Sequence, residues 1–315
     1  MKKRGTNMTR ITDLLGIEYP IFQGAMAQIS TSQLARAVSE AGGLGIIASG
    51  GMTADQLREE INKTRAITKK PFAVNVMLMM TNCDEIVDVI IESNVKIITT
   101  GAGTPKKYMP GLKEAGVIVI PVVPSAKLAK KMEDLGADAV VAEGTEAGGH
   151  IGEVATMPLI AAVTKAVSIP VMAAGGFSDG RGLAAALALG AEGVQMGTVY
   201  LASTECPIPD SFKEKVVESI ETSTVVTGRK NGAPVRTIRN TMTTKYLEME
   251  SHEVPREELE KLTMGSLRKA VVEGDVENGS LMAGQILGNI SNIRSVAQIH
   301  EDILTEYRHI SLPKL

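Results

Sequence analysis

The 315-residue sequence predicts an α/β fold, a (β/α)₈ TIM barrel with a C-terminal, mostly helical lid. Two observations support this prediction: eight short apolar runs alternate with amphipathic segments at a regular spacing, and glycine-rich loops follow most of the runs. The runs are continuously apolar, as expected of strands buried on both faces. Because the functional loops of such barrels follow the carboxyl ends of the strands, these loops should share one rim.

The expected elements alternate along the first two thirds of the chain. Strands are expected at residues 20–23, 44–48, 72–77, 97–100, 117–123, 139–142, 170–173 and 193–196. Helices with one apolar face are expected at residues 32–40, 54–66, 84–91, 127–135, 159–167 and 181–189. Glycine ends several of these helices, as at Gly136 and Gly190, which is a structural use of that residue.

The alternation stops after Thr204, which indicates a second part of the chain. We expect a cofactor-binding barrel at residues 8–204, a C-terminal substrate or lid subdomain at 205–290, and a terminal helix returning to the barrel at 291–315. Within this second part, β-prone sequence is found at 225–239, a charged helix is expected at 256–272, and the last helix at 293–307. Residues 1–7 are interpreted as a loose tail, which leaves Met8 as an alternative start to Met1.

Composition and charge exclude several classes of function. A net charge of −3 and an aromatic content of 3% without Trp give no basis for nucleic-acid binding. No apolar run approaches the ~20 residues of a membrane-spanning helix, and no apolar segment follows the basic start to form a secretory signal. Cys83 and Cys206 form no Cys-x-x-Cys pair, so we expect neither a disulfide framework nor a zinc site, and a reducing cytoplasm fits.

The loop at residues 142–152 is the predicted centre of the chemistry. It follows a buried run and combines several glycines with three side chains that can exchange protons or hydrogen bonds, namely Glu143, Glu146 and His150. Glycine lets a ligand approach the backbone closely, and histidine titrates near neutral pH. This combination predicts an active-site loop. The alternative is an ordinary surface connection whose glycines make turns.

The loops after the last two expected strands predict a phosphate site. Gly175-Gly176 and Gly197-Thr198 offer backbone N–H groups beside a helix N-terminus, where parallel barrels bind anions. The alternative is a pair of tight turns that need glycine. No G-x-G-x-x-G run follows any strand, so a Rossmann dinucleotide site is disfavoured.

Several motifs in a fixed order resemble one family of flavin-dependent barrels. They are Gln23-Gly24-Ala25-Met26-Ala27, Asn75, Glu143-Gly144-x-Glu146-Ala147-Gly148-Gly149-His150, Ala174-Gly175-Gly176 with Asp179-Gly180, and Gln195-Met196-Gly197-Thr198. The family includes the nitronate monooxygenases and the type II enoyl-acyl carrier protein (ACP) reductases. Thr227-Gly228-Arg229 and the runs 268–275 and 279–285 are similar to the reductase branch in particular. The resemblance spans about residues 11–290.

The resemblance implies FMN bound in the barrel, with its phosphate on the two loops after the last strands and its ring over the loop after the first strand, near Asn75. The implied cofactor-binding residues are Gly24, Ala25, Met26, Ala27, Ser49, Asn75, Glu143, Gly148, Gly149, Ala174, Gly175, Gly176, Gln195, Met196, Gly197 and Thr198. Glu143 stands where the monooxygenases usually have Gln and the reductases Glu. Ala25 and Val199-Tyr200 depart from the reductase pattern, which has a second Gly and Arg-Phe.

By the same resemblance, the expected activity is NAD(P)H-dependent reduction of an enoyl-ACP in fatty acid elongation, with FMN carrying the hydride. His150 is the expected catalytic residue, as a hydrogen-bond or proton donor to the substrate. Enoyl-ACP and a second copy of the chain in a homodimer are the implied partners. Arg229, Arg236 and Arg239 are expected to form a docking patch for the acidic carrier. The choice between NADH and NADPH and the preferred acyl length stay open.

The remaining polar residues carry simpler expectations. His252, His300 and His309 lie in charged helical sequence and are expected to be solvated. No His, Asp or Glu pair has the spacing of transition-metal ligands. The resemblance implies only a monovalent cation near Asn278 and Ser280.

Three other functions remain open. A nitronate monooxygenase would use His150 to remove a proton from carbon and would consume oxygen, although Glu143 and residues 278–285 favour the reductase. A flavin-binding protein without turnover is disfavoured because storage needs no proton donor. A cofactor-free, phosphate-binding barrel isomerase would bind no flavin.

Overall fold

Eight parallel strands form the barrel in the computed structural model, which describes residues 9–311. The strands are β1 (Ile21–Gln23), β2 (Gly45–Ala48), β3 (Phe72–Met77), β4 (Ile97–Gly101), β5 (Ile118–Val123), β6 (Val140–Glu143), β8 (Val171–Ala174) and β9 (Gly193–Met196). Their order is β1-β9-β8-β6-β5-β4-β3-β2, and a parallel bridge between Phe22 and Leu44 brings the two ends of the sheet together. The predicted barrel is confirmed, and no strand boundary differs from its expected position by more than one residue. The expected tail and the alternative start at Met8 lie outside the described residues.

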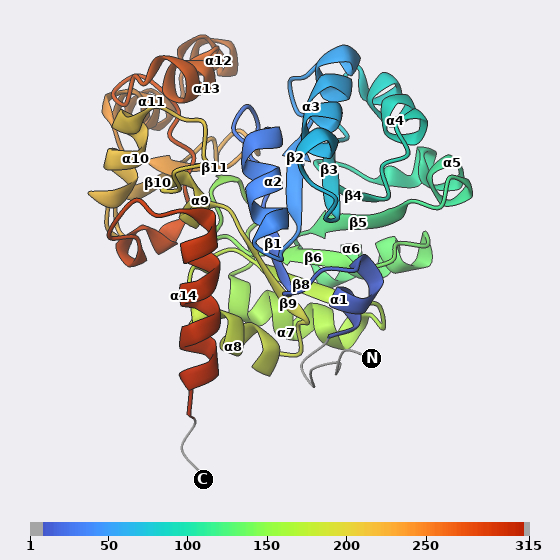
Figure 1. The fold of residues 1–315 in the computed structure, drawn as a ribbon. Coiled ribbons are helices and arrows are strands. Elements are labelled where there is room, and N and C mark those ends of the chain that lie inside the picture. Colours follow the sequence, from blue (N-terminus) through green and yellow to red (C-terminus); the bar gives the residue numbers. More distant parts are fainter. Residues whose placement is uncertain (1–8, 312–315) are drawn as a thin grey trace.

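Helices cover the barrel between successive strands (Figure 1). They are α1 (Arg10–Leu15), α2 (Ser32–Glu40), α3 (Ala54–Ile67), α4 (Cys83–Glu92), η1 (Pro105–Lys107), α5 (Met109–Glu114), α6 (Ala126–Asp134), α7 (Thr156–Ala166), α8 (Gly180–Ala188) and α9 (Thr198–Leu201). The six expected helices are present. The short helices α1 and α5 are not among the expected ones, and α5 contains Pro110 and Gly111, which disfavour helix in a sequence pattern but are tolerated in a first turn.

The C-terminal part contributes helices and a small sheet. Its elements are α10 (Asp210–Val217), β10 (Thr224–Thr227), β11 (Val235–Ile238), α11 (Thr241–Ser251), α12 (Arg256–Thr263), α13 (Ser266–Arg268), the π-turn η2 (Lys269–Glu273), the 3₁₀ turn η3 (Gln285–Asn289) and α14 (Val296–His309). The expected single helix at 256–272 is wrong because Gly265, at φ +72°, interrupts it. Strand β11 is the central strand of this sheet: it pairs on one side with β10 and on the other with a two-residue strand, β7 (Gly149–His150), which lies inside the predicted active-site loop.

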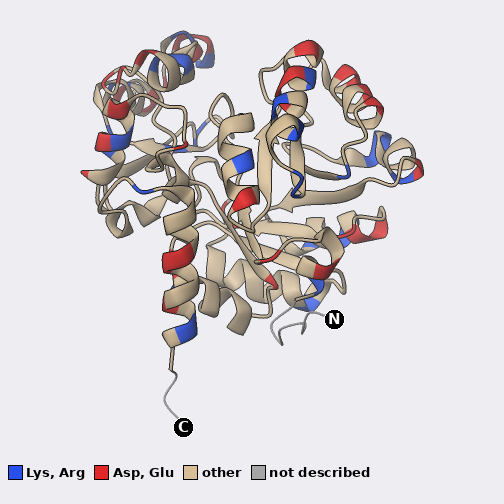
Figure 2. Cartoon of the chain, in the orientation of Figure 1, with Lys and Arg blue, Asp and Glu red and all other residues tan. Residues whose placement is uncertain are grey.

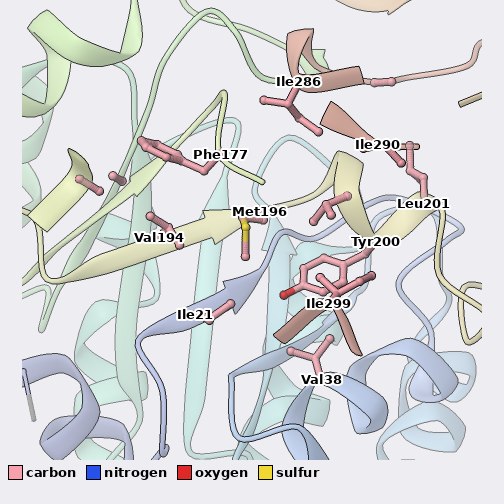
Figure 3. Packing of buried hydrophobic residues seen from close by; sticks show 14 of the residues in the cluster. Ile21, Val38, Phe177, Val194, Met196, Tyr200, Leu201, Ile286, Ile290 and Ile299 are labelled. Carbon is pink, nitrogen blue, oxygen red and sulfur yellow. The ribbon is translucent and has the colours of Figure 1, made fainter. Parts of the chain in front are cut away.

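The core of the barrel is continuous with the C-terminal part. Ile21, Val194 and Met196 pack in one cluster with Ile286 and Ile299. Figure 3 shows Ile299 next to Tyr200 and the other side chains of the cluster spread between the barrel strands and the C-terminal part. Helix α14 lies against α8 and α2, which fixes the end of the chain on the barrel wall. Burial of apolar side chains, which is the largest favourable contribution to folding, therefore holds the C-terminal part against the barrel.

His300 corrects one expectation, because it is buried rather than solvated, with 2% of its surface exposed. Its Nε2 is 2.8 Å from the Tyr200 hydroxyl, and its Nδ1 is 3.2 Å from the Ala41 carbonyl oxygen. Burial lowers the pKa of His300 to about 4, so the ring is neutral near pH 7. The buried stripe of α14 also contains Val296 and Ile303, so the helical spacing carried this signal. His252 and His309 are exposed, as expected.

Charged side chains lie mainly on the outer helices, where Lys and Arg are interspersed with Asp and Glu, while the barrel strands are largely free of charge (Figure 2). Across residues 9–311, no helix combines the length and the apolar content needed to cross a bilayer.

Candidate active site

A cavity of about 470 Å³ opens at the carboxyl ends of the strands. It is lined by nearly all of the residues proposed from the sequence, namely Gly24–Ala27, Asn75, Glu143, Gly148–His150, Ala174–Gly176 and Gln195–Thr198. Ser49 is the exception: it is buried, and its hydroxyl donates to the Asn75 carbonyl oxygen at 2.7 Å. Ser49 therefore supports the strand that carries Asn75. The cavity has the size of a small-molecule or cofactor site.

The loop after β8 presents backbone N–H groups to the cavity. Gly175 and Gly176 have φ values of +91° and +86°, a conformation that favours glycine. A Cβ on Gly175 would lie 2.8 Å from the Gly144 carbonyl oxygen, so this position also has no room for a side chain. Within the described residues, the N–H groups of Gly175, Gly176 and Gly197 have no backbone or side-chain acceptor. These donors suit an anion.

The start of helix α8 is not available for the expected anion. The Asp179 carboxylate accepts from the Gly182 N–H at 2.8 Å, and the Glu306 carboxylate accepts from the Gly180 N–H at 2.7 Å. The chain's own carboxylates thus cap this helix. The donors that remain are those of the loops after β8 and β9, which narrows the predicted phosphate site to Gly175, Gly176, Gly197 and Thr198.

The His150 loop also lines the cavity, next to the loop after β8, and it pairs with the C-terminal part. Val235 and Arg236 of β11 lie opposite His150 and Gly149, and the Ile151 N–H donates to the Pro234 carbonyl oxygen at 3.1 Å. His150 is exposed and lines the cavity. A pairing between residues some 85 positions apart has no local sequence signal, so the sequence could not predict it.

Sequence reasoning missed several residues that line the cavity. The C-terminal part contributes Leu267, Met282, Gly284 and Ile286, and the barrel contributes Met77 and Thr99. Most of these residues are apolar, and in a sequence an apolar residue that lines a binding cavity looks the same as one that packs in the core. The resemblance covered the 279–285 run but gave Met282 and Gly284 no place in the cavity.

Glu143 is the unpaired acid of the cavity. It ends β6 and accepts no hydrogen bond from any described residue. Burial without a compensating charge raises its pKa to about 7. At neutral pH a substantial fraction of this carboxyl group is therefore protonated and able to donate a hydrogen bond.

Glu146, by contrast, has a structural role. Its carboxylate accepts from the Thr156 N–H at 2.9 Å and lies 2.6 Å from the Thr156 hydroxyl oxygen, which caps the first turn of α7. The Glu146 carbonyl oxygen accepts from the Gln285 N–H at 2.9 Å. Of the three side chains singled out in this loop, only Glu143 and His150 remain free for chemistry.

The expected docking patch is corrected at one position. Arg236 is buried, with 7% of its surface exposed, so it cannot contact a carrier protein directly. Arg229 and Arg239 are exposed, and Arg229 forms an ion pair with Glu153 at 2.9 Å.

The proposed cation site stays a prediction. The side-chain amide of Asn278 donates to the Asp275 carboxylate at 3.0 Å, and the Ser280 and Ser266 hydroxyls are 2.7 Å apart. Among residues 9–311, no group of three His, Cys, Asp or Glu side chains could hold a metal ion.

Comparisons with known proteins agree with this geometry. The family model for nitronate monooxygenase matches residues 8–86 and 79–306. The FabK protein of Thermotoga maritima has a solved structure with 54% sequence identity and a TM-score of 0.94, covering 96% of this chain and 97% of that chain. A (3aS,4S,5R,7aS)-5-hydroxy-7a-methyl-1-oxo-octahydro-1H-indene-4-carboxyl-CoA dehydrogenase of Mycobacterium tuberculosis is 35% identical over 95% of both chains. A "Probable nitronate monooxygenase" of Staphylococcus saprophyticus is 34% identical over 88% of this chain and 91% of that protein. The chain therefore belongs to the nitronate monooxygenase family of oxidoreductases.

Proposed function

We propose that the protein is an FMN- and NAD(P)H-dependent enoyl-ACP reductase that acts in the cytoplasm in fatty acid elongation. The observation that carries this proposal is the 54% identity to FabK, a type II enoyl-ACP reductase, together with a single cavity that is lined both by His150 and by the N–H donors of the loops after β8 and β9. A homodimer and a monovalent cation near Asn278 and Ser280 are part of the same proposal.

The cavity fits FMN. The N–H groups of Gly175, Gly176 and Gly197 have no acceptor within the described residues, and these donors match a phosphate. Gly24 lies on the cavity wall between β1 and β9, where its N–H donates to the Met196 carbonyl oxygen at 2.7 Å. Gly24, Ala25 and Ala27 present only backbone and small side chains there, which leaves room for a planar ring.

Bound FMN would supply the hydride chemistry, taking a hydride from NAD(P)H and returning it to the β carbon of the enoyl thioester. The protein's part is then acid–base and positional. His150 donates a hydrogen bond to the thioester carbonyl oxygen as negative charge develops there. A proton must also reach the α carbon, and His150 is the donor on the same wall of the cavity.

Glu143 has a separate role in this proposal. Its raised pKa keeps part of the carboxyl group protonated near pH 7. A neutral carboxyl group donates one hydrogen bond and avoids placing a full negative charge beside a cofactor that must accept a hydride. Glu143 therefore helps to hold the cofactor.

The substrate class is an acyl thioester. FabK and the carboxyl-CoA dehydrogenase of Mycobacterium tuberculosis are both close relatives, and the latter's name specifies a CoA ester. The apolar wall formed by Met26, Met77, Ile151 and Met282 fits an acyl chain.

A nitronate monooxygenase is the second candidate, and the observation that favours it is the name of the family model and of the staphylococcal relatives. In that reaction His150 would act as a base toward carbon. The same cavity and the same cofactor loops would serve, so the distinction rests on the reaction itself.

An anaerobic experiment separates the two functions. The purified protein is mixed with NADH or NADPH, and the flavin absorbance is followed before and after addition of a crotonyl thioester or an alkyl nitronate. We expect the nicotinamide to bleach the flavin and the thioester to restore it without oxygen. If the nicotinamide is inert and the nitronate bleaches the flavin, the protein is the monooxygenase. A protein that binds flavin and responds to neither would be a carrier.

A further inference from the structure

We infer that Arg236 is a positioning residue that holds the His150 loop in its working shape. The inference rests on the proposed function for the role of His150, whereas the contacts of Arg236 stand independently of it. Arg236 lies on β11 and is buried, so it belongs to neither the surface nor the cavity lining.

The guanidinium group of Arg236 binds one backbone carbonyl twice. Its Nε and Nη2 donate to the Thr145 carbonyl oxygen at 3.1 and 2.9 Å, and its Nη1 donates to the Thr224 hydroxyl at 3.0 Å. In the described part of the chain it forms no ion pair with a carboxylate. Burial lowers the pKa of this guanidinium, since desolvation disfavours its charge. Burying this charge is costly, and its hydrogen bonds offset the cost together with the longer-range attraction of the Glu146 carboxylate.

One residue thereby holds both ends of a glycine-rich segment. The backbone of Arg236 lies opposite Gly149 in the β7–β11 pairing, and its side chain binds the carbonyl of Thr145. The segment between them contains Gly148, and His150 follows directly. Glycine gives this segment many accessible conformations, so contacts from outside it are needed to select one. Glu146 supplies some of them through Thr156 and Gln285, and the Thr145 N–H donates to the Val154 carbonyl oxygen at 2.9 Å. Arg236 is the contact that holds the Thr145 carbonyl oxygen. Thr145 also has a buried hydroxyl without a hydrogen-bond partner in the described chain, so its side chain supplies no alternative anchor.

Lysine cannot replace this contact. The planar guanidinium presents two parallel donors to Thr145 and a third to Thr224, whereas an ammonium group is a single point of attachment. The Arg236→Lys variant keeps the positive charge but loses the paired guanidinium donors. The Arg236→Met variant has a side chain of similar size but loses both the charge and the donors.

The expected effect falls on one half-reaction. Because His150 acts on the thioester, a displaced loop should slow flavin reoxidation by a crotonyl thioester and leave flavin reduction by the nicotinamide unchanged. A displacement of about 1 Å at a catalytic group can cost on the order of 100-fold in rate. We expect about a 100-fold loss of kcat for Arg236→Met and about a tenfold loss for Arg236→Lys, with KM changed less than about threefold. Arg256→Met is the matched control, since it removes an exposed guanidinium of α12 that pairs only with Glu260.

Two further measurements test whether the loss of activity arises from displacement of the His150 loop. In amide hydrogen exchange of the flavin-loaded protein, peptides covering residues 145–151 should exchange faster in Arg236→Met while the β8 and β9 peptides do not change. In a double-mutant cycle, His150→Ala with Arg236→Met should be no slower than His150→Ala alone, because the two residues act through the same group. If Arg236→Met does not fold, Arg236→Lys is used for both measurements.

Each outcome decides the inference. Equal slowing of both half-reactions, unchanged exchange at 145–151, or additive losses in the double variant would each overturn it. If the wild-type protein reduces no enoyl thioester, the proposed function fails, and the exchange experiment alone then decides whether Arg236 holds the loop.

Discussion

The two walls of the cavity are held in shape by different means. The strand wall, formed by the loops after β1, β8 and β9, is fixed by backbone geometry, as at Gly175 with its φ of +91°. The loop wall, residues 143–152, is fixed by side chains from elsewhere, with Glu146 capping α7 and Arg236 binding Thr145. In the proposed function, the strand wall supplies backbone donors for the cofactor, while the loop wall supplies His150 for proton exchange and Glu143 as a further cofactor contact. On this proposal, substitutions in the strand wall should act mainly on cofactor binding, and substitution of His150 should act mainly on the chemistry.

The largest loss of activity is expected when His150 is substituted, because this removes the proposed proton donor and leaves the cofactor-binding loops unchanged. General acid–base groups contribute about 10²- to 10⁴-fold, so His150→Ala should lower kcat for enoyl reduction within that range. Flavin content and the rate of flavin reduction should not change, since the strand wall is intact. The measurement is single-turnover flavin absorbance, with His252→Ala as the control because His252 is exposed and remote in sequence. Full turnover by His150→Ala would remove His150 from the mechanism.

Glu143 should make the stability of the cofactor-free protein depend on pH. Its pKa is about 7 in the folded protein because of burial, against an ordinary value of 4.5. The folded state therefore holds a proton that the unfolded chain has lost between about pH 4.5 and 7, so stability falls as the pH rises through this window. The Glu143→Gln side chain does not titrate in this range. The free energy of unfolding of this variant should therefore exceed that of the wild type by an amount that grows with pH, to at most about 3 kcal/mol at pH 8.

Denaturant unfolding at pH 4.5, 6 and 8 measures this difference. A constant difference between the wild type and Glu143→Gln over that range would show that the Glu143 carboxyl group has an ordinary pKa. The amide keeps the size of the side chain, so a change in packing is not expected to contribute.

The sequence located residues of both walls, but it did not predict the contacts that hold the loop wall. Continuous apolar runs located every barrel strand, and because parallel strands end at one rim, the loops at Gly24, Gly175 and Gly197 could be placed together. The resemblance then indicated flavin. The shape of the loop wall depends on contacts between distant segments, such as Arg236 with Thr145, and such contacts leave no periodic pattern. For the same reason the sequence places Arg236 on the surface, whereas it is buried. His300 differs, because its position in the buried stripe of α14 follows from helical spacing.

Gly175→Ala should damage the cofactor-binding turn of the strand wall, and its Cβ would also press on Gly144 at the start of the adjoining loop wall. An alanine at φ +91° with its Cβ 2.8 Å from the Gly144 carbonyl oxygen is strained, at a cost of about 1–3 kcal/mol. Flavin affinity should fall by about tenfold or more, since the N–H donors at this turn move. Gly51→Ala is the matched control, because Gly51 has a φ of +85° and a Cβ added there would have no atom within 4 Å. Equal flavin dissociation constants for the two variants, measured by fluorescence titration, would mean that this turn does not bind the cofactor.

The smallest effect is expected for substitution of Arg229, an exposed residue that pairs with Glu153 just beyond the loop wall. Arg229 and Glu153 form an exposed ion pair at 2.9 Å, and such pairs contribute about 0–1 kcal/mol, so Arg229→Ala should barely change the melting temperature. Rim charges act instead on association with a charged partner. If the acidic carrier docks here, Arg229→Ala raises KM for crotonyl-ACP by a few-fold at low salt and leaves KM for crotonyl-CoA unchanged, while Glu153→Ala lowers KM for crotonyl-ACP because it frees the guanidinium. Equal KM changes for the two thioesters would place the carrier on another face, and the rim pair would then have only its small structural role.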